Sequence, residues 1–176
     1  MLTRKALLCI FTFVACGFFV VPANVPALHG YDMVIPDQRI QLSESGSATG
    51  KWEARDLSID YRYSGAPGAF SISGTVNFAD SIVYNFESMP SFHADLIFAD
   101  SRGRVLGMYG LLTASESGFD RWDPVKFEHR FVLPPGTASF AFSYRGDVVE
   151  GGGRRGGGSN PTHIWAYPLT KAPAVQ

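Results

Sequence analysis

The sequence predicts an all-β protein, a single antiparallel β-sandwich that follows an N-terminal apolar segment. Three observations support this prediction. Apolar and polar residues alternate along most of the chain after residue 50, as they do in strands that bury one face of a sheet. Segments rich in glycine and proline separate the alternating stretches, and such segments form the turns between strands. Outside the apolar segment, no stretch keeps a helical period over the length that a helix needs.

The chain begins with a short basic region and a long apolar one. Arg4 and Lys5 precede an uncharged run of mostly apolar residues, which is the pattern of an export signal. Residues 1–27 are therefore assigned to a signal peptide or to an N-terminal membrane anchor. Cleavage after Ala23 or Ala27 would release a secreted domain, whereas an uncleaved segment would hold the domain at the membrane.

Both cysteines of the chain, Cys9 and Cys16, lie in this apolar segment. Cys16 ends the sequence Phe13-Val14-Ala15-Cys16, which is similar to the lipobox of lipoproteins, so lipidation of Cys16 is a third possibility for the N-terminus. A cysteine inside a signal helix is the simpler interpretation. The remainder of the chain has no cysteine, and its stability must come from packing rather than from disulfides.

Composition excludes one class of partner. The formal net charge is −1, and no basic stripe is present, so nucleic acid is not an expected partner. Contact with a membrane is expected only through the N-terminal segment. The length that follows this segment suits one domain with a sizeable core.

The expected elements follow one another along residues 28–176. Residues 28–50 are assigned to a spacer, because residues 41–50 are rich in serine and glycine. Residues 51–170 are assigned to the β-sandwich, with Trp52 as the expected filling of the core between the sheets. Clear alternation predicts strands at residues 57–64, 70–78, 92–99, 125–133 and 138–145.

Three further segments are less regular. Residues 104–112 are apolar on both faces, which predicts either a central strand covered on both sides or a strand with a bulge at Gly107 or Gly110. Residues 80–89 suit a short strand or a single helical turn. A last strand is expected at residues 164–167.

The C-terminal part contains a glycine-rich loop at residues 150–160, because glycine offers no side chain to pack. Trp165 is expected to anchor the returning chain on the sheet, and residues 171–176 form a tail.

One phrase of the sequence resembles a known class of domain. Residues 92–106 end in the turn Asp100-x-x-Gly103-Arg104-Val105-Leu106. This segment resembles the strands and turns of immunoglobulin-like or fibronectin-like domains of bacterial envelopes. The resemblance implies the type of sandwich and an exported location, in the periplasm or the cell envelope. It implies no functional residue.

The histidines do not form a local metal motif. His93 and His129 lie in different expected strands and could face one another near Asp95 or Glu128. A hydrogen-bonded strand histidine is the preferred interpretation over a metal ligand, so no metal and no cofactor are expected. The chain also lacks the G-x-S-x-G elbow of many hydrolases, and it is not expected to be an enzyme.

Two tryptophans are the candidate ligand-binding residues. Trp122 lies between Asp120 and Asp123 in the expected loop 115–124. It is either a plug over the end of the core or an exposed platform, on which a sugar ring stacks while carboxylates bind its hydroxyl groups. Trp165 is the second candidate platform. The tripeptide Arg145-Gly146-Asp147 is assigned no function.

The sequence therefore predicts an exported, non-catalytic domain of the bacterial envelope that acts by binding or by assembly with a partner, either an envelope protein or a glycan. One alternative is a carbohydrate- or small-ligand-binding module that uses the loop tryptophans. A second alternative is a hydrolase whose catalytic triad is scattered along the sequence.

Overall fold

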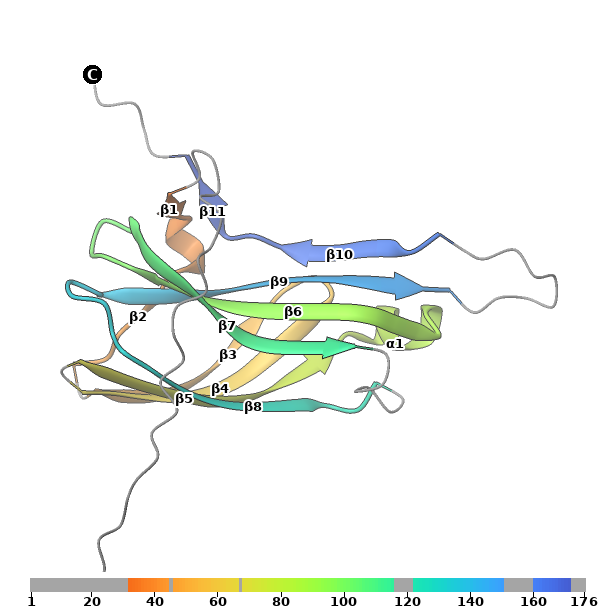
Figure 1. The fold of residues 1–176 in the computed structure, drawn as a ribbon, viewed down its shortest axis with the longest axis horizontal. Coiled ribbons are helices and arrows are strands. Elements are labelled where there is room, and N and C mark those ends of the chain that lie inside the picture. The colour runs from red at the N-terminus through yellow and green to blue at the C-terminus, as the bar shows by residue number, and fades with distance from the viewer. Residues whose placement is uncertain (1–31, 45, 67, 116–121, 151–159, 172–176) are drawn as a thin grey trace, which may run out of the picture.

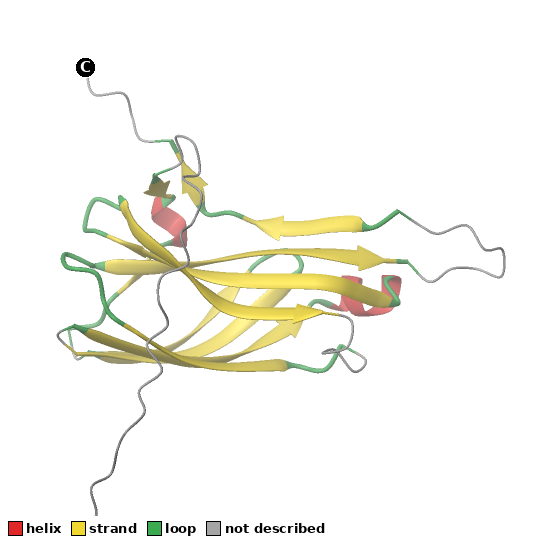
Figure 2. Ribbon diagram, in the orientation of Figure 1, coloured by secondary structure: helices red, strands yellow, loops and turns green. Residues whose placement is uncertain are grey.

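The computed structural model describes residues 32–44, 46–66, 68–115, 122–150 and 160–171. In these residues the protein is all-β, as the alternating pattern predicts, and its two main sheets are antiparallel and face each other in a sandwich-like arrangement (Figure 1). Two short helical segments accompany the strands (Figure 2). Neither of these helical segments of the described chain has the length or the hydropathy of a membrane-spanning helix.

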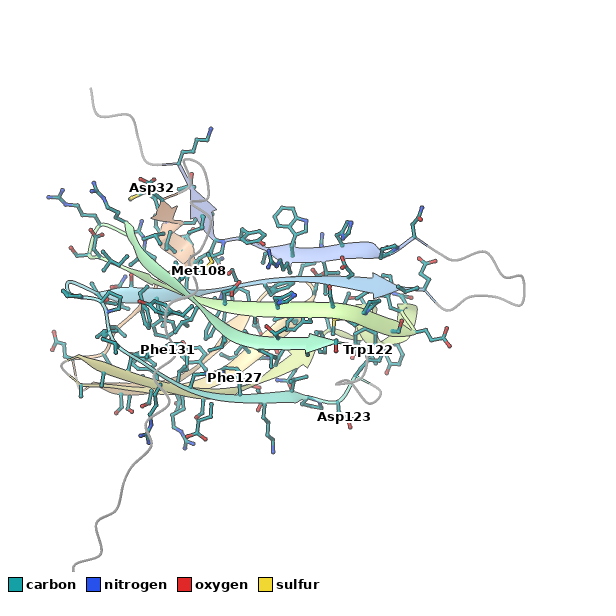
Figure 3. The ribbon with its side chains drawn as sticks, in the orientation of Figure 1. Asp32, Met108, Trp122, Asp123, Phe127 and Phe131 are labelled. Carbon is teal, nitrogen blue, oxygen red and sulfur yellow. The ribbon has the colours of Figure 1, made fainter. Side chains whose placement is uncertain are left out.

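The first sheet has the strand order β3-β4-β5-β8. Its strands are β3 (Ser47–Glu53), β4 (Leu57–Ala66), β5 (Ala69–Phe78) and β8 (Val125–Phe131). Every second residue of β4 and β5 points into the core, and the residues between them are polar. Figure 3 shows Phe127 and Phe131 of β8 between the two sheets.

The second sheet has the order β10-β9-β6-β7, and β2 also pairs with β9. Its strands are β2 (Ile40–Gln41), β6 (Ser88–Ala99), β7 (Val105–Ser115), β9 (Ser139–Val149) and β10 (Thr162–Ala166). The strands β2 and β10 share one edge of β9, because β2 pairs with its beginning and β10 with its end.

A small third sheet lies against the outer face of the second one. Its strands β1 (Met33–Val34) and β11 (Leu169–Thr170) pair with each other near the two ends of the described chain. The 3-10 helix η1 (Pro36–Gln38) follows β1. Val34 and Leu169 pack on Ile97 and Ala141 and form a second, smaller apolar cluster.

The space between the main sheets is filled largely by aromatic rings. Phe70 of β5 lies in edge-to-face contact with Phe98 and Phe140, with ring centroids 5.1 Å and 5.5 Å away. Such contacts add to the free energy gained by burying the rings. Trp52 is only 8% exposed and packs on Phe142 at 5.7 Å, which confirms the predicted role of Trp52 in the core.

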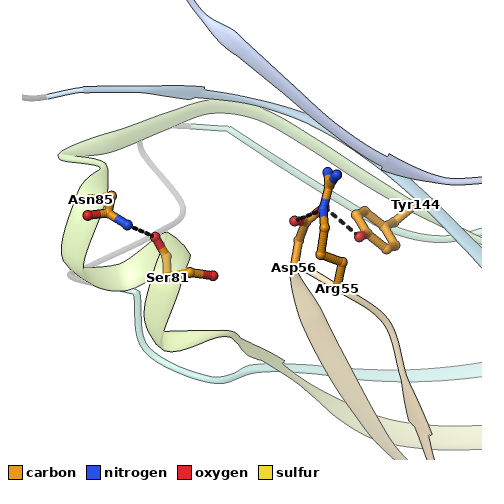
Figure 4. A network of polar contacts seen from close by, with 5 residues as sticks. All are labelled: Arg55, Asp56, Ser81, Asn85 and Tyr144. Atoms are coloured by element: carbon orange, nitrogen blue, oxygen red, sulfur yellow. Dashed lines mark hydrogen bonds and ion pairs between the residues drawn. The ribbon is translucent and has the colours of Figure 1, made fainter.

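One carboxylate is buried at the end of this core (Figure 4). Asp56 is 4% exposed and receives hydrogen bonds from Arg55, with Nε to Oδ1 at 2.8 Å and Nη2 to Oδ2 at 3.1 Å. The hydroxyl of Tyr144 donates a further hydrogen bond of 2.7 Å to Oδ2. Because Asp56 precedes β4 and Tyr144 belongs to β9, this contact connects the two sheets. Burial raises the pKa of Tyr144, and the bond to Asp56 raises it further.

Strand β3 begins at Ser47, inside the segment that the sequence assigns to a spacer. The inner residues of this part of β3 are Ala48 and Gly50, which are too small to produce an alternating apolar signal. The ring of Tyr61 on β4 occupies the space that a side chain at position 50 would need. Sequence composition therefore suggests a spacer where the structure has a strand.

Two open alternatives of the sequence analysis are resolved. Residues of the segment 80–89 form the helix α1 (Asp80–Asn85), in which the side chain of Asn85 donates a hydrogen bond of 2.8 Å to the carbonyl of Ser81 (Figure 4). Strand β7 is an edge strand of its sheet rather than a central one. Its register against β6 shifts at Leu106 and Leu111, next to Gly107 and Gly110, as expected for a strand with bulges. Both faces are also covered in part, because Val105 and Met108 pack on the outer apolar cluster while Leu111 lies in the main core.

Candidate functional site

The outer face of the second sheet changes from apolar to polar along its length. At one end, Ile97 of β6 and Ala141 of β9 lie beneath β1 and β11. At the other end, a shallow pocket of about 330 Å³ lies over β6, β9 and β10. Its polar lining comes from Ser91, His93, Arg145, Asp147 and His163, together with the aromatic residues Trp165 and Tyr167. We call this pocket the Trp165 site.

Strand register explains how these residues meet. Trp165 of β10 lies opposite Arg145 of β9, and Arg145 lies opposite His93 of β6. In the neighbouring row, His163 lies opposite Asp147, and Asp147 lies opposite Ser91. Residues directly opposite each other on antiparallel strands point to the same face, so β6 and the consecutive strands β9 and β10 together supply one surface.

Asp147 is the centre of a hydrogen-bonded group. Its Oδ2 accepts a hydrogen bond of 2.8 Å from the Ser91 hydroxyl, and its Oδ1 lies 2.6 Å from Nδ1 of His163. The bond from Ser91, then that from His163, and then the nearby charges of His163 and His93 hold the pKa of Asp147 below its usual value. Asp147 therefore stays ionised and fixes the orientation of the two side chains beside it.

The order of these contacts differs from that of a catalytic triad. In a triad, a histidine lies between the carboxylate and the hydroxyl and removes the proton of the nucleophile. Here the carboxylate of Asp147 lies between Ser91 and His163. This arrangement orients the serine hydroxyl but does not activate it as a nucleophile.

Two aromatic side chains stand at the edge of the site. Trp165 is 59% exposed, and the neighbouring Tyr167 is also exposed. Their ring centroids are 6.1 Å apart, with an angle of 34° between the ring planes. An exposed indole beside polar groups offers an apolar surface to a ligand and hydrogen-bonding groups to the periphery of that ligand.

Trp165 does not anchor the chain in the core, contrary to the expectation from the sequence. That role belongs to Ile164, which is 3% exposed and packs in the main core. His163, Trp165 and Tyr167 occupy the outward positions of the alternation, while Ile164 and Ala166 occupy the inward ones. The size of the indole suggests burial, but the alternation along β10 places Trp165 on the outer face of the sheet and Ile164 on the inner face.

Trp122 lies in a different environment from Trp165. Its ring packs on Phe78 at 5.5 Å in an edge-to-face arrangement, and it is half-buried against the main core. Figure 3 shows Trp122 and Asp123 at the beginning of β8. Asp123 is exposed, while Asp120 lies outside the described residues. The geometry of Trp122 is that of a plug at the end of the sandwich.

His93 and His129 do not face one another, because they belong to different sheets. His129 lies on the inward phase of β8 and stacks on Phe131 at 5.8 Å. His93 lies on the outer face of the second sheet, with Nδ1 at 3.3 Å from the hydroxyl of Thr113. Among the described residues, no group of three or more histidine, aspartate or glutamate side chains is arranged to hold a metal ion.

A larger hollow of about 820 Å³ lies on the outer face of the first sheet. Its charged lining alternates in sign and includes Lys51, Asp60, Arg62, Lys126 and Glu128. None of the exposed large apolar side chains of the described chain lies in this hollow. The Trp165 site is smaller, but it combines exposed aromatic rings with fixed polar groups, and it is the better candidate.

The sequence alone points to Trp165 but not to the residues that surround it. The signal for the surrounding residues is the alternation along residues 143–149 and 162–167. It places Arg145 and Asp147 on one face of β9, and His163 and Trp165 on one face of β10. That these two faces form one surface depends on strand pairing. Cys16 and the apolar N-terminal segment lie outside the described residues.

Comparisons with known proteins add no assignment. No model of a protein family matches the chain, and no curated protein matches its sequence.

Proposed function

We propose that this protein is an exported, non-catalytic domain of the bacterial envelope and that it binds a carbohydrate at the Trp165 site. The observation that carries this proposal is the exposed Trp165 ring beside Tyr167, at the margin of a group of fixed hydrogen-bonding side chains. A sugar ring has an apolar face that can cover an indole, and it has hydroxyl groups that exchange hydrogen bonds with carboxylate, imidazole and hydroxyl groups.

The polar part of the site suits this ligand. Asp147 is ionised and accepts hydrogen bonds, and its contacts with Ser91 and His163 hold all three side chains in place. A preorganised set of polar groups loses little conformational entropy when it binds a ligand. The pocket is shallow and lies on strands of the sheet rather than on loops, so its shape depends on rigid elements.

The type of sandwich is part of the proposal. In an immunoglobulin- or fibronectin-like domain, strands A, B and E lie in one sheet, and strands G, F and C, with C′ in some members, lie in the other. The order β4-β5-β8 opposite β10-β9-β6-β7 follows the same pattern. Strand β3 is then an additional strand beside β4.

Export is proposed on the basis of the sequence. The basic residues Arg4 and Lys5 and the apolar run that follows them support a signal peptide or an anchor. Mass analysis of the N-terminus of the protein, isolated from separated cell fractions, tests this part. Recovery of the uncleaved chain in the cytoplasm alone would contradict export.

Binding is tested by titrating the purified protein with a panel of oligosaccharides in a calorimeter, a readout that does not depend on the fluorescence of Trp165. The panel should include at least one ligand, and Trp165→Ala should weaken its affinity at least about tenfold, or about 1.4 kcal/mol. Tyr84→Ala is the matched control, because Tyr84 is an exposed aromatic residue on α1, away from the site. A ligand that binds Trp165→Ala as tightly as the wild type would refute the assignment of the site, and the absence of any ligand in the panel would refute the function.

A further inference from the structure

We propose that the ligand of the Trp165 site carries a carboxylate, as a glycan built from uronic acids does, and that Arg145 binds this carboxylate. The inference rests on the proposed carbohydrate binding and names the class of sugar that the site selects. Three observations carry it: the position of Arg145, the lack of an ion pair or hydrogen bond for its guanidinium group among the described residues, and the hydrogen bonds that already engage both oxygens of the neighbouring Asp147.

Arg145 lies at the centre of the site. On β9 it is flanked across the sheet by Trp165 on one side and His93 on the other. Its side chain is exposed. Side chains directly opposite each other on antiparallel strands have Cβ atoms about 5 Å apart, so one sugar residue that covers the indole also lies within reach of the guanidinium group.

The guanidinium group of Arg145 is available for a ligand. The ion pairs found among the described residues do not include Arg145, and its side chain forms no hydrogen bond with another described residue. Its charge acts on Asp95 without an ion-pair contact. An arginine that serves the stability of a fold is normally paired or packed, whereas an exposed and unpaired one in a pocket can form two parallel hydrogen bonds with a carboxylate.

The acidic groups nearby do not satisfy this charge. Asp147 uses Oδ2 for the bond from Ser91 and Oδ1 for the bond with His163. Asp95 of β6 is half-buried, and burial raises its pKa, while the charge of Arg145 acts in the opposite direction. The pocket therefore presents a guanidinium group that has no direct hydrogen bond or ion pair among the described residues, beside one carboxylate that is already hydrogen-bonded and one that is half-buried.

The neighbouring groups complete a site for an acidic sugar. The indole of Trp165 covers the ring, the guanidinium group of Arg145 binds the carboxylate, and the Asp147 group binds hydroxyl groups. A neutral sugar would use only the first and the third of these contacts and would leave Arg145 with water. Selectivity for the acidic ligand follows from this difference.

The experiment compares two forms of one glycan. Oligogalacturonate is titrated by calorimetry into the purified protein, and the same oligomer with its carboxyl groups methyl-esterified is titrated in parallel. We expect the acidic form to bind at least about tenfold more tightly than the ester and to lose affinity as the salt concentration rises. Oligomers of glucuronate and mannuronate extend the test to other arrangements of the hydroxyl groups.

Variants assign the effect to Arg145. Arg145→Gln should weaken the acidic oligomer at least about tenfold and leave the ester unchanged, and Arg145→Lys should give an intermediate affinity because lysine cannot form the two parallel bonds. Arg62→Gln, which removes an exposed arginine from the outer face of the first sheet, is the matched control. Because Arg145 is exposed, these variants should keep the melting temperature of the wild type.

The outcomes separate the two proposals. If wild-type protein binds the ester as tightly as the acid, or if Arg145→Gln binds the acid as tightly as the wild type, this inference is wrong while carbohydrate binding stands. If no acidic or neutral oligomer binds, then the proposed function and this inference both fail.

Discussion

Replacing Tyr144 by phenylalanine should lower the free energy of unfolding by about 1.5–3 kcal/mol, the range for a hydrogen bond to a charged group. The substitution keeps the ring and its contacts with Trp52 and Phe92. It removes only the hydroxyl group that donates the 2.7 Å hydrogen bond to Oδ2 of Asp56. Because this bond connects the two sheets, its loss acts on the sandwich as a whole.

The contacts of Asp56 determine the size of the effect. Asp56 is almost fully buried, so the loss of a donor cannot be replaced freely by water. Oδ2 keeps the bond from Nη2 of Arg55 at 3.1 Å, and Oδ1 keeps the bond from Nε at 2.8 Å. The carboxylate of Asp56 therefore loses the hydrogen bond from Tyr144 but keeps those from Arg55. We expect the free energy of unfolding to fall by less than the roughly 3–5 kcal/mol that is lost when a buried ion pair loses one partner.

Urea denaturation, followed by tryptophan fluorescence and by circular dichroism, measures the difference. Tyr84→Phe is the control, because Tyr84 is 81% exposed and the loss of its hydroxyl should change stability by less than about 0.5 kcal/mol. The dependence of the unfolding free energy on urea concentration should be the same in all three proteins. A Tyr144→Phe protein within about 0.5 kcal/mol of the wild type would refute the reasoning.

Three further predictions concern the core, a turn and the Asp147 group. Phe70→Ala should cost about 3–5 kcal/mol in urea denaturation, because this ring is fully buried among other rings; a cost below about 1 kcal/mol would contradict this. Gly103→Ala should destabilise the protein by about 1–3 kcal/mol, because φ is +88° at this position and a Cβ atom would displace the guanidinium group of Arg39; an unchanged melting temperature would count against this prediction. Hydrogen bonds from Ser91 and His163 lower the pKa of Asp147 in the folded protein, so its stabilising effect is complete above the unfolded pKa of about 3.9 and is lost as the pH falls through the lower folded value. The destabilisation caused by Asp147→Asn should therefore shrink in acid, and a difference that stays constant down to about pH 2 would exclude this origin.

The strands that the sequence predicts are those whose inward residues are large. Strands β4 and β5 bury residues such as Ile59, Tyr63, Phe70 and Ile72 at every second position, and the alternation alone locates them. Strand β3 escapes prediction because its inward positions in residues 47–50 hold Ala48 and Gly50, and a ring from the next strand fills the space beside Gly50. Small inward residues give no alternating apolar pattern in the sequence, even where a large side chain from the neighbouring strand fills the core beside them.

The candidate site shows the same limit of local information. The alternation on β9 puts Arg145 and Asp147 on one face, and that on β10 does the same for His163 and Trp165. The register that places Trp165 opposite Arg145 is set by pairing between strands, which a single sequence does not display. The choice between Ile164 and Trp165 as the buried residue also depends on which face meets the other sheet, because both residues are apolar.

The pairing of β1 with β11 brings the two ends of the described chain to one corner of the fold. A short linker could therefore join residue 171 to residue 32 without disturbing either main sheet, and new ends could be opened in the turn between β4 and β5. A circular permutant made in this way should keep the order of strands around Trp165. Fusion partners attached directly at residues 32 and 171 would meet each other at that corner, beside the smaller apolar cluster of the outer face.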